Sequence, residues 1–201
     1  DRYNVKTIAL CFNNHIGCDI ETDFNGYCKI GTEEDVEIIM APQFVNGVTP
    51  VSSTSIRKHL SSGDIEEANE ILGYSYNLSG KVISGKHLGR TIGFPTANIE
   101  PESQFKLIPA NGVYVCTASL NSSQAYPAMV NIGHRPTVDR PDAPATIEAH
   151  LIGYDGDLYG DELTLSFIKH LRSEIRFNNI GELKTQLEAD KHNVLKELSN
   201  I

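Results

Sequence analysis

The sequence predicts a mainly β protein, in which a small β-barrel carries a C-terminal helix and follows an incomplete α/β segment. Three observations lead to this fold class. Short β-type runs fill residues 78–171, the last segment has helical hydrophobic periodicity, and the opening residues mix strand-like and helix-like stretches. A chain of 201 residues is long enough for one medium domain or two small ones.

The opening residues have the pattern of the tail of an α/β unit. Val5–Leu10 and Val36–Met40 are apolar enough for buried strands, and we expect a loop between them. Because the α/β pattern starts with a strand that usually comes late in such a unit, we expect the N-terminal part of this unit to be missing. We therefore expect residues 1–74 to be the C-terminal portion of a larger α/β domain and residues 75–201 to form a domain of their own.

Two short helices are expected at the end of this first portion. The first starts at Ser53 or Thr54, whose side chains suit an N-cap, and it ends at a glycine. In the second, Asp64 and Glu67 have the spacing of a capping box, and Gly73 ends the helix. Directly after them, the sequence changes from helix-like segments to short strand-like runs.

The barrel is predicted from strand-like runs separated by Gly, Pro, Asn and Asp. The runs are Gly80–Ser84, Gly112–Leu120, Tyr126–Ile132, Ala145–Ile152 and Glu162–Ile168. After them, residues 180–198 predict an amphipathic helix that packs on the barrel. Its apolar positions, at helical steps, are Ile180, Leu183, Leu187, Val194 and Leu198.

The charge balance limits the kinds of partner. Lys and Arg total 17 against 26 Asp and Glu, a formal net charge of −9, so a broad electrostatic grip on nucleic acid is not expected. Any phosphate must be held locally. The sequence has no apolar run of about 18 residues and no signal-peptide pattern at its start, so we expect a cytoplasmic protein without a membrane partner.

The four cysteines do not form a disulfide framework, and none belongs to a Cys-x-x-Cys pair. An alternative is that Cys11, His15, Cys18 and Cys28 bind zinc, but their spacing is irregular. We expect reduced thiols without a metal.

The densest chemical signal is a glycine-rich loop within residues 85–98. Gly85, Gly89 and Gly93 are spaced by four, which lets a backbone approach an anionic ligand, while Lys86 and Arg90 add positive charge. This pattern predicts a phosphate cradle. The alternative is a flexible turn between strands.

The loop ends in Pro-Thr-Ala-Asn, which adds a candidate metal site. In an extended segment Thr96 and Asn98 project from the same face, and both carry neutral oxygens. Two neutral ligands bind Mg²⁺ weakly unless the ion arrives with nucleotide phosphates. The alternative is a turn in which both side chains bond their own backbone.

A candidate base lies on the strand around Glu148. Alternation places Ile147 and its apolar neighbours on one face, and Thr146, Glu148 and His150 on the other. A carboxylate at an open end of a barrel can take the proton from an attacking hydroxyl. The alternative is a solvated surface residue.

Two polar loops, residues 131–137 and 171–177, follow strand ends and contain aromatic or proline residues. Such loops can wall a site for a flat ligand that forms hydrogen bonds. Ordinary turn chemistry and an ion pair are the alternative.

In this order, the segments resemble riboflavin kinase, as it occurs in the C-terminal part of the bacterial bifunctional riboflavin kinase/FMN adenylyltransferase family. Six blocks over essentially the whole chain carry the resemblance: Gly85–Asn98, Asn111–Tyr114, Asn131–Thr137, the Glu148 strand, Gly156–Gly160 and Arg172–Phe177. The resemblance implies a six-stranded Greek-key (split) barrel with a C-terminal helix.

The resemblance also implies the site. It makes Glu148 the catalytic base and places Mg²⁺ at Thr96 and Asn98. The implied ATP-binding residues are Gly85, Lys86, Gly89, Arg90, Gly93 and Thr96, and the implied flavin-binding residues are Thr146, Arg172, Glu174 and Phe177.

Part of the opening portion resembles the end of an adenylyltransferase domain. The residues concerned, whose hydroxyls and guanidinium would contact nucleotide phosphates at a helix N-terminus, are Ser52, Ser53, Thr54 and Arg57. The His-x-Gly-His motif of that domain is absent, and Asn13–Gly17 is similar to a later loop. We therefore expect the remainder of this domain, its own N-terminal half, as a missing partner, and we do not expect FAD synthesis from this chain.

The sequence thus predicts a kinase that transfers the γ-phosphate of ATP to the 5′-hydroxyl of riboflavin with Mg²⁺, and gives FMN. The intact protein is expected to convert FMN to FAD as well. Two alternatives remain open: a flavin-binding or regulatory module without turnover, and an opening portion that still transfers AMP. The expected partners are small molecules only, namely ATP, riboflavin and FMN.

Overall fold

The structure is a computed structural model of the whole chain, and it describes residues 5–11, 23–42, 45–46, 49–85, 88–120, 124–133 and 145–200. Its contacts divide the chain into two compact units, Asp1–Val51 and Ser52–Ile201. This division by contacts differs from the predicted boundary after residue 74, which concerns the two domains and stays a prediction.

The first unit contains a parallel pair of strands, β1 (Thr7–Cys11) and β2 (Glu37–Ala41). Both strands were predicted. The segment between them is not only a loop, as predicted from sequence, but contains helix α1 (Phe24–Glu33). Parallel neighbours need a crossover of a dozen or more residues, for which a helix is the usual solution. A short antiparallel ladder, β3 (Val45–Asn46) with β4 (Thr49–Pro50), completes the unit.

Helix α1 begins where the Asp23 carboxylate accepts a hydrogen bond from the Gly26 amide at 2.8 Å. Its Gly31 is buried, and a Cβ there would collide with the Val36 carbonyl and the Ile38 side chain. The glycine therefore lets the helix approach β2 closely. Two glycines within a helix hide it from propensity-based prediction.

The second unit opens with helices α2 (Ser53–Ser62) and α3 (Ile65–Leu72). The N-cap of α2 is Ser52 rather than the predicted Ser53 or Thr54, and its hydroxyl accepts from the Ser55 amide. The predicted capping box of α3 is wrong, because the Asp64 carboxylate instead accepts from the Ser62 hydroxyl at 2.8 Å. Left-handed glycines end both helices as predicted.

Six antiparallel strands then form a closed barrel in the order β10-β5-β6-β9-β8-β7, which confirms the predicted mainly β fold. The strands are β5 (Asn77–Ile83), β6 (Ala97–Pro101), β7 (Gly112–Leu120), β8 (Gln124–Gly133), β9 (Thr146–Leu151) and β10 (Glu162–Arg172). Strand β10 pairs with both β5 and β7 and so closes the sheet on itself. The barrel interior is the main hydrophobic core.

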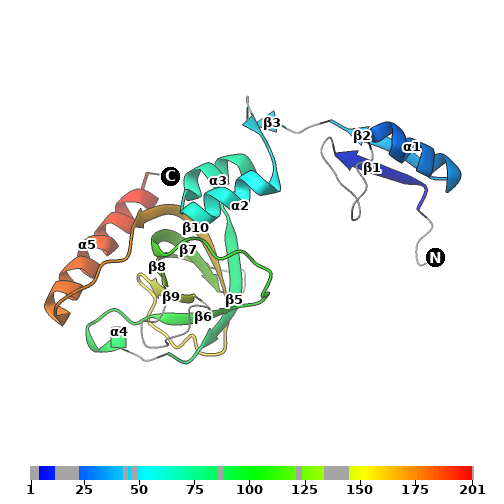
Figure 1. Cartoon of the computed structure of the whole chain (residues 1–201). Coiled ribbons are helices and arrows are strands. Elements are labelled where there is room, and N and C mark those ends of the chain that lie inside the picture. Colours follow the sequence, from blue (N-terminus) through cyan, green and yellow to red (C-terminus); the bar gives the residue numbers. More distant parts are fainter. Residues whose placement is uncertain are drawn as a thin grey trace. The chain divides into compact units, whose positions relative to one another are not determined.

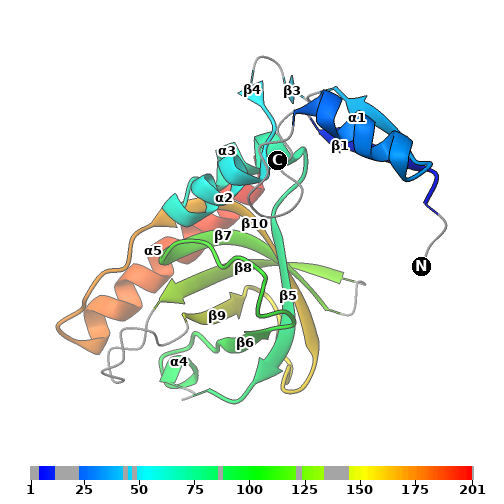
Figure 2. The ribbon, with the colours of Figure 1, turned by 45° about the vertical axis from the view of Figure 1, so that its right-hand side comes forward.

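The helices cover the barrel from three sides. Helices α2 and α3 lie at one of its ends, and the one-turn α4 (Leu88–Thr91) lies at the other (Figures 1 and 2). Helix α5 (Ile180–Leu198) runs along the outside (Figure 2), where Val194 packs with Val113, Val115 and Met129 in a second core. The predicted packing of this helix is confirmed, except that Ile180 is exposed.

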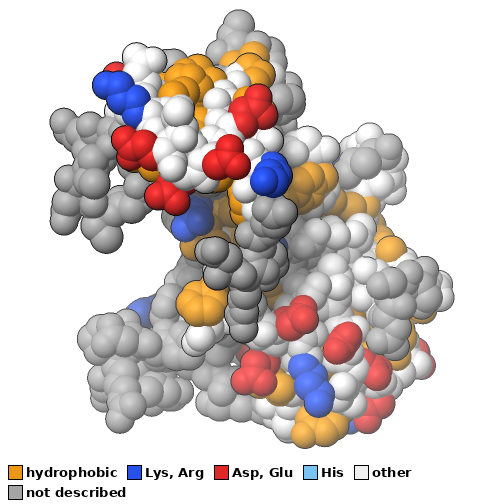
Figure 3. Space-filling model, turned by 90° about the vertical axis from the view of Figure 1, so that its right-hand side faces the viewer, with side chains coloured by type: hydrophobic (Ala, Val, Ile, Leu, Met, Phe, Trp, Pro, Cys, Tyr) orange, Lys and Arg blue, Asp and Glu red, His pale blue; other side chains and the backbone are white. Residues whose placement is uncertain are grey.

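Charged side chains of both signs lie on the surface (Figure 3). On the face drawn in Figure 3, the coloured residues show acidic side chains at several places among hydrophobic and neutral ones, and basic side chains only singly. No helix in the described part of the chain is long and apolar enough to cross a membrane.

Candidate functional site

Glu148 lies in the middle of β9, between two asparagines of the neighbouring strands. Its Cα pairs with Asn98 on β6 and with Asn131 on β8. Residues opposed in an antiparallel ladder project to the same face of the sheet. Since Ile147 and Ala149 point into the barrel core, this polar face is the outer one, and the predicted alternation along the strand is confirmed.

A cavity of about 340 Å³ opens over this face, and we call it the Glu148 pocket. Its floor holds Glu148, His150 and Asn131, and its apolar walls include Phe94 and Met129. The segment after β10 adds a third wall, and Leu183 and Leu187 of α5 add a fourth. Concave, mostly apolar cavities of this size with a few convergent polar groups are typical of small-molecule sites.

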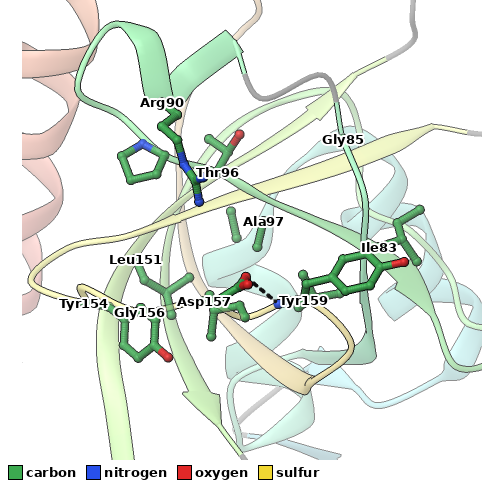
Figure 4. A pocket seen from close by; sticks show the side chains of 14 residues that line it. Ile83, Gly85, Arg90, Thr96, Ala97, Leu151, Tyr154, Gly156, Asp157 and Tyr159 are labelled. Atoms are coloured by element: carbon green, nitrogen blue, oxygen red, sulfur yellow. Dashed lines mark hydrogen bonds between the residues drawn. The ribbon is translucent and has the colours of Figure 1, made fainter.

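A second, smaller cavity of about 80 Å³, the Arg90 pocket, lies beside the first. Figure 4 shows the Arg90 side chain reaching from α4 toward its centre, close to Thr96, with the rings of Tyr154 and Tyr159 farther along the cavity. Gly85 contributes backbone to its wall. Thr96 lines both cavities, so the two pockets meet at this residue.

The structure brings most of the predicted site residues into these two cavities. The Glu148 pocket collects Glu148, Gly89, Thr96, Arg172, Glu174 and Phe177, and the Arg90 pocket collects Gly85, Arg90 and Thr96. These residues come from helix α4, strands β9 and β10, and the loops around residues 85, 96 and 173–177. Their convergence is a property of the barrel and is not visible in the sequence.

Asn98 lies next to the pockets rather than in their lining. Its side chain is buried, and a Cβ on Gly85 would collide with its amide. Gly85 is therefore a close-approach glycine that makes room for Asn98. Gly89 has the same role toward the backbone of Phe94, where a Cβ would collide with the carbonyl oxygen.

The other predicted residues lie elsewhere. Gly93 is an exposed turn residue with φ of 87° and lines neither cavity. The Thr146 hydroxyl donates to the Gly133 carbonyl at 3.0 Å, within the β8–β9 ladder. Lys86, residues 134–137 and the possible zinc ligands His15 and Cys18 lie outside the described residues, as does the loop Asn13–Gly17.

The four adenylyltransferase-like residues gather at the start of α2. Ser52 caps this helix, and Ser53, Thr54 and Arg57 are exposed in its first turns. None of the four lines the Glu148 pocket or the Arg90 pocket.

His150 is a pocket residue that the sequence analysis placed on the correct face but did not select. Its Nδ1 lies 2.8 Å from the Pro95 carbonyl, and its ring lies 5.2 Å from that of Phe94. Burial lowers the pKa of this imidazole, which favours the neutral form with the proton on Nδ1. A neutral His150 thus fastens the segment before Thr96 to β9.

The third wall of the Glu148 pocket is held by contacts that the sequence did not reveal. The Glu174 carboxylate packs against Gly133, where a Cβ would collide with it. The Arg172 guanidinium donates to Asp190 on α5, with 2.7 Å between Nη2 and Oδ2. A signal for Asp190 exists, because it falls between Leu187 and Val194 on the apolar face of the helix.

The chain is similar to known proteins over most of its length. The family model described as flavokinase, riboflavin kinase, matches residues 72–198. The bifunctional riboflavin kinase/FMN adenylyltransferase of Bacillus subtilis (strain 168) is 40% identical over 153 residues, which are 75% of this chain and 48% of that protein. The protein of the same name from Pseudomonas fluorescens is 36% identical over 190 residues, 94% of this chain and 60% of that protein.

A solved structure with a different title is also similar. The crystal structure titled macrolide-efflux protein from Streptococcus pneumoniae matches with a TM-score of 0.76 and 30% identity, over 90% of this chain and 57% of that chain. The chain thus spans between 48% and 60% of the two curated relatives. The barrel, the helix α5 and both cavities fall within the part that the family model matches.

Proposed function

The chain belongs to the riboflavin kinase family, and we propose that it transfers the γ-phosphate of ATP to the 5′-hydroxyl of riboflavin, giving FMN and ADP. The observation that carries the proposal is the junction of the two cavities at Thr96, with Glu148 on the floor of the larger one. A phosphoryl transfer needs such a junction, because acceptor and donor must meet in line.

The Glu148 pocket suits riboflavin. An isoalloxazine ring is flat and apolar over most of its area but carries hydrogen-bonding groups along one edge. The walls formed by Phe94, Phe177 and Leu187 match the ring, while Glu174 and Asn131 can meet polar groups of the flavin. The ribityl chain then extends across the floor toward Thr96.

The Arg90 pocket suits the nucleotide. Arg90 brings a guanidinium, and the backbone at Gly85 can approach phosphate oxygens closely. Tyr154, Asp157 and Tyr159 line the same cavity, and the last two belong to the block Gly156–Gly160 that the sequence analysis named only as part of a resemblance. In Figure 4 the rings of Tyr154 and Tyr159 lie farther along the cavity from Arg90, and we assign the rest of the nucleotide to this side.

Mg²⁺ fits the donor set beside these pockets. Thr96, whose side chain carries a hydroxyl, lines both cavities, and the Asn98 amide occupies the space that Gly85 leaves. Two neutral oxygens suit a hard cation that takes its remaining ligands from phosphates and water. The bound ion would neutralise charge on the phosphates of ATP.

The chemical step assigned to the chain is a proton transfer with positioning. Glu148 accepts the proton of the ribityl 5′-hydroxyl as its oxygen bonds to the γ-phosphorus, and the bond from that phosphorus to ADP breaks. Arg90 holds the phosphates in line. Phe94 and the leucines of α5 exclude water, which limits hydrolysis of ATP.

The longer relatives bear on the opening portion. Their printed names add an FMN adenylyltransferase, and this chain spans between 48% and 60% of two of them. We assign residues 1–74 to the C-terminal portion of such a domain, with Ser52, Ser53, Thr54 and Arg57 at its nucleotide-binding end. The partner proposed for residues 1–74 is the N-terminal half of that same domain. We also propose a cytoplasmic location for the protein.

The test is chromatography of two mixtures. The chain is incubated with riboflavin, ATP and Mg²⁺, and separately with FMN, ATP and Mg²⁺, and FMN and FAD are measured. We expect FMN from the first mixture and no FAD from either. Riboflavin binding without FMN would favour a flavin-binding module, and FAD would show that the opening portion still transfers AMP.

A further inference from the structure

The wall of the Glu148 pocket formed by residues 172–177 is tied to helix α5 by an ion pair between the half-buried Arg172 and the buried Asp190. Arg172 is the last residue of β10, and its Nε lies 3.1 and 3.0 Å from the two carboxylate oxygens of Asp190. Its Nη2 lies 2.7 Å from Oδ2. This fork-to-carboxylate geometry fixes both the direction and the rotation of the guanidinium.

Asp190 is unusual for a helix packed on a barrel. Asp190 carries a carboxylate but is only 1% exposed, and it lies on the apolar face of α5 together with Val194. Gln186, one turn earlier, donates a further hydrogen bond to Oδ1 at 2.8 Å. A buried ion pair is often no more stabilising than apolar side chains of similar volume, so stability alone does not account for it.

The pair connects two walls of the same cavity. Arg172 donates from Nη1 to the Ser173 carbonyl, which orients the first peptide of the segment that carries Glu174, Ile175 and Phe177. On the other side, Leu187 lines the cavity from α5, less than one turn before Asp190. The ion pair therefore sets the distance between these two walls.

We propose that Asp190 is a positioning residue for the flavin: through Arg172 it holds the segment 173–177 against α5 and so sets the width of the pocket. The inference rests on the proposed function of this pocket. It also changes the role of Arg172. Three of its donor hydrogens serve Asp190 and Ser173, so its main task is to shape the wall rather than to bind the ligand.

A second ion pair between the same two elements offers a matched control. Lys169, also on β10, lies 3.2 Å from Glu197 on α5, and neither residue lines the Glu148 pocket. Loss of this pair loosens the same interface without touching the segment 173–177. Only the Asp190 pair is expected to affect the flavin.

The experiment compares Asp190→Asn with Glu197→Gln in the full chain. Asn keeps the shape and one acceptor oxygen but removes the charge that orients Arg172. We expect the Kd for riboflavin, measured by quenching of flavin fluorescence, and its KM to rise about tenfold in Asp190→Asn. The KM for ATP and both constants in Glu197→Gln stay at the wild-type values. An unchanged riboflavin Kd, or equal rises for riboflavin and ATP, would overturn the proposal.

Arg172→Lys covers the case in which Asp190→Asn does not fold, because it keeps the charge but loses the fork. We expect the same selective rise for riboflavin. In addition, amide hydrogen exchange at residues 173–177 should become faster in either variant than in wild type, and unchanged exchange would count against the proposal. This readout needs no turnover, so a wild-type chain that makes no FMN would refute the proposed function while the exchange still tests the positioning role.

Discussion

At the scale of single residues, the surroundings of Glu148 match the task proposed for it. Its ladder neighbours, Asn98 and Asn131, are neutral amides. A neutral neighbour can orient a carboxylate by a hydrogen bond but does not compete, as a cation would, with the incoming proton. In the proposed reaction, the adjoining apolar walls would keep water away from the attacking hydroxyl.

Glu148→Gln should therefore separate binding from chemistry. The amide keeps the shape of the side chain but cannot accept the proton, so we expect kcat to fall about 10²-fold or more while the Kd for ATP stays near the wild-type value. Steady-state kinetics and nucleotide titration measure both. Glu100→Gln, on the exposed end of β6, is the control and should match wild type. An unchanged kcat in Glu148→Gln would remove Glu148 from the role of base.

Gly85→Ala tests whether the glycine loop serves close approach. The added Cβ would displace the buried Asn98 amide, so we expect the KM for Mg·ATP to rise about tenfold. Gly73→Ala is the matched control, because Gly73 has φ of 76° and nothing within 4 Å of an added Cβ. That change should cost about 1 kcal/mol of stability and leave the kinetics intact. A wild-type KM in Gly85→Ala would contradict the metal and phosphate roles of this loop.

At the scale of elements, local patterns predict much of this fold. The predicted strands coincide broadly with β5 and β7 to β10, because alternation and turn residues are local features. Strand β6 was predicted only as an extended segment around Pro-Thr-Ala-Asn, since its five residues include Pro101 and are too few to show a period. Its pairing with β9, which brings Asn98 beside Glu148, is a long-range contact without a local signal.

The same limit explains what was missed at the site. The apolar spacing of α5 predicts a packed helix, yet Asp190 breaks that spacing and was not selected. A charged residue at an apolar position of an amphipathic helix indicates a buried partner, but the sequence cannot say that the partner is Arg172. Likewise, alternation places His150 beside Glu148, while its bond to Pro95 depends on the folded barrel.

At the scale of the whole molecule, the proposed kinase site belongs to the second unit alone. Among the described residues, all those that line the two cavities lie at or after Val82. Helices α2 and α3 belong to the same unit for a different reason: Leu60, Ile65 and Ala68 are buried in the core of the barrel. The predicted boundary after residue 74 would cut between these helices and that core.

Two truncated chains turn this into a prediction about folding and activity. Residues 52–201 should form FMN with the kcat of the full chain, because they keep both cavities and the whole core. Residues 75–201 should melt at a markedly lower temperature. They lose Ile65 and Ala68, and they lose Asn69, whose side chain donates to the Phe167 carbonyl at 2.9 Å and accepts from the Tyr76 amide.

Thermal unfolding and FMN formation, measured on the full chain and both truncated chains, decide between the two divisions. Residues 75–201 lack Leu60 as well as Ile65, and loss of these two buried aliphatic side chains from the core costs several kcal/mol, roughly 2–5 for each, which is a large part of the stability of a small domain. If residues 75–201 melt as high as residues 52–201, helices α2 and α3 are dispensable for the barrel, and the boundary after residue 74 is the better one. If they melt lower, the two helices fold with the kinase, although their first turn carries the residues that resemble an adenylyltransferase.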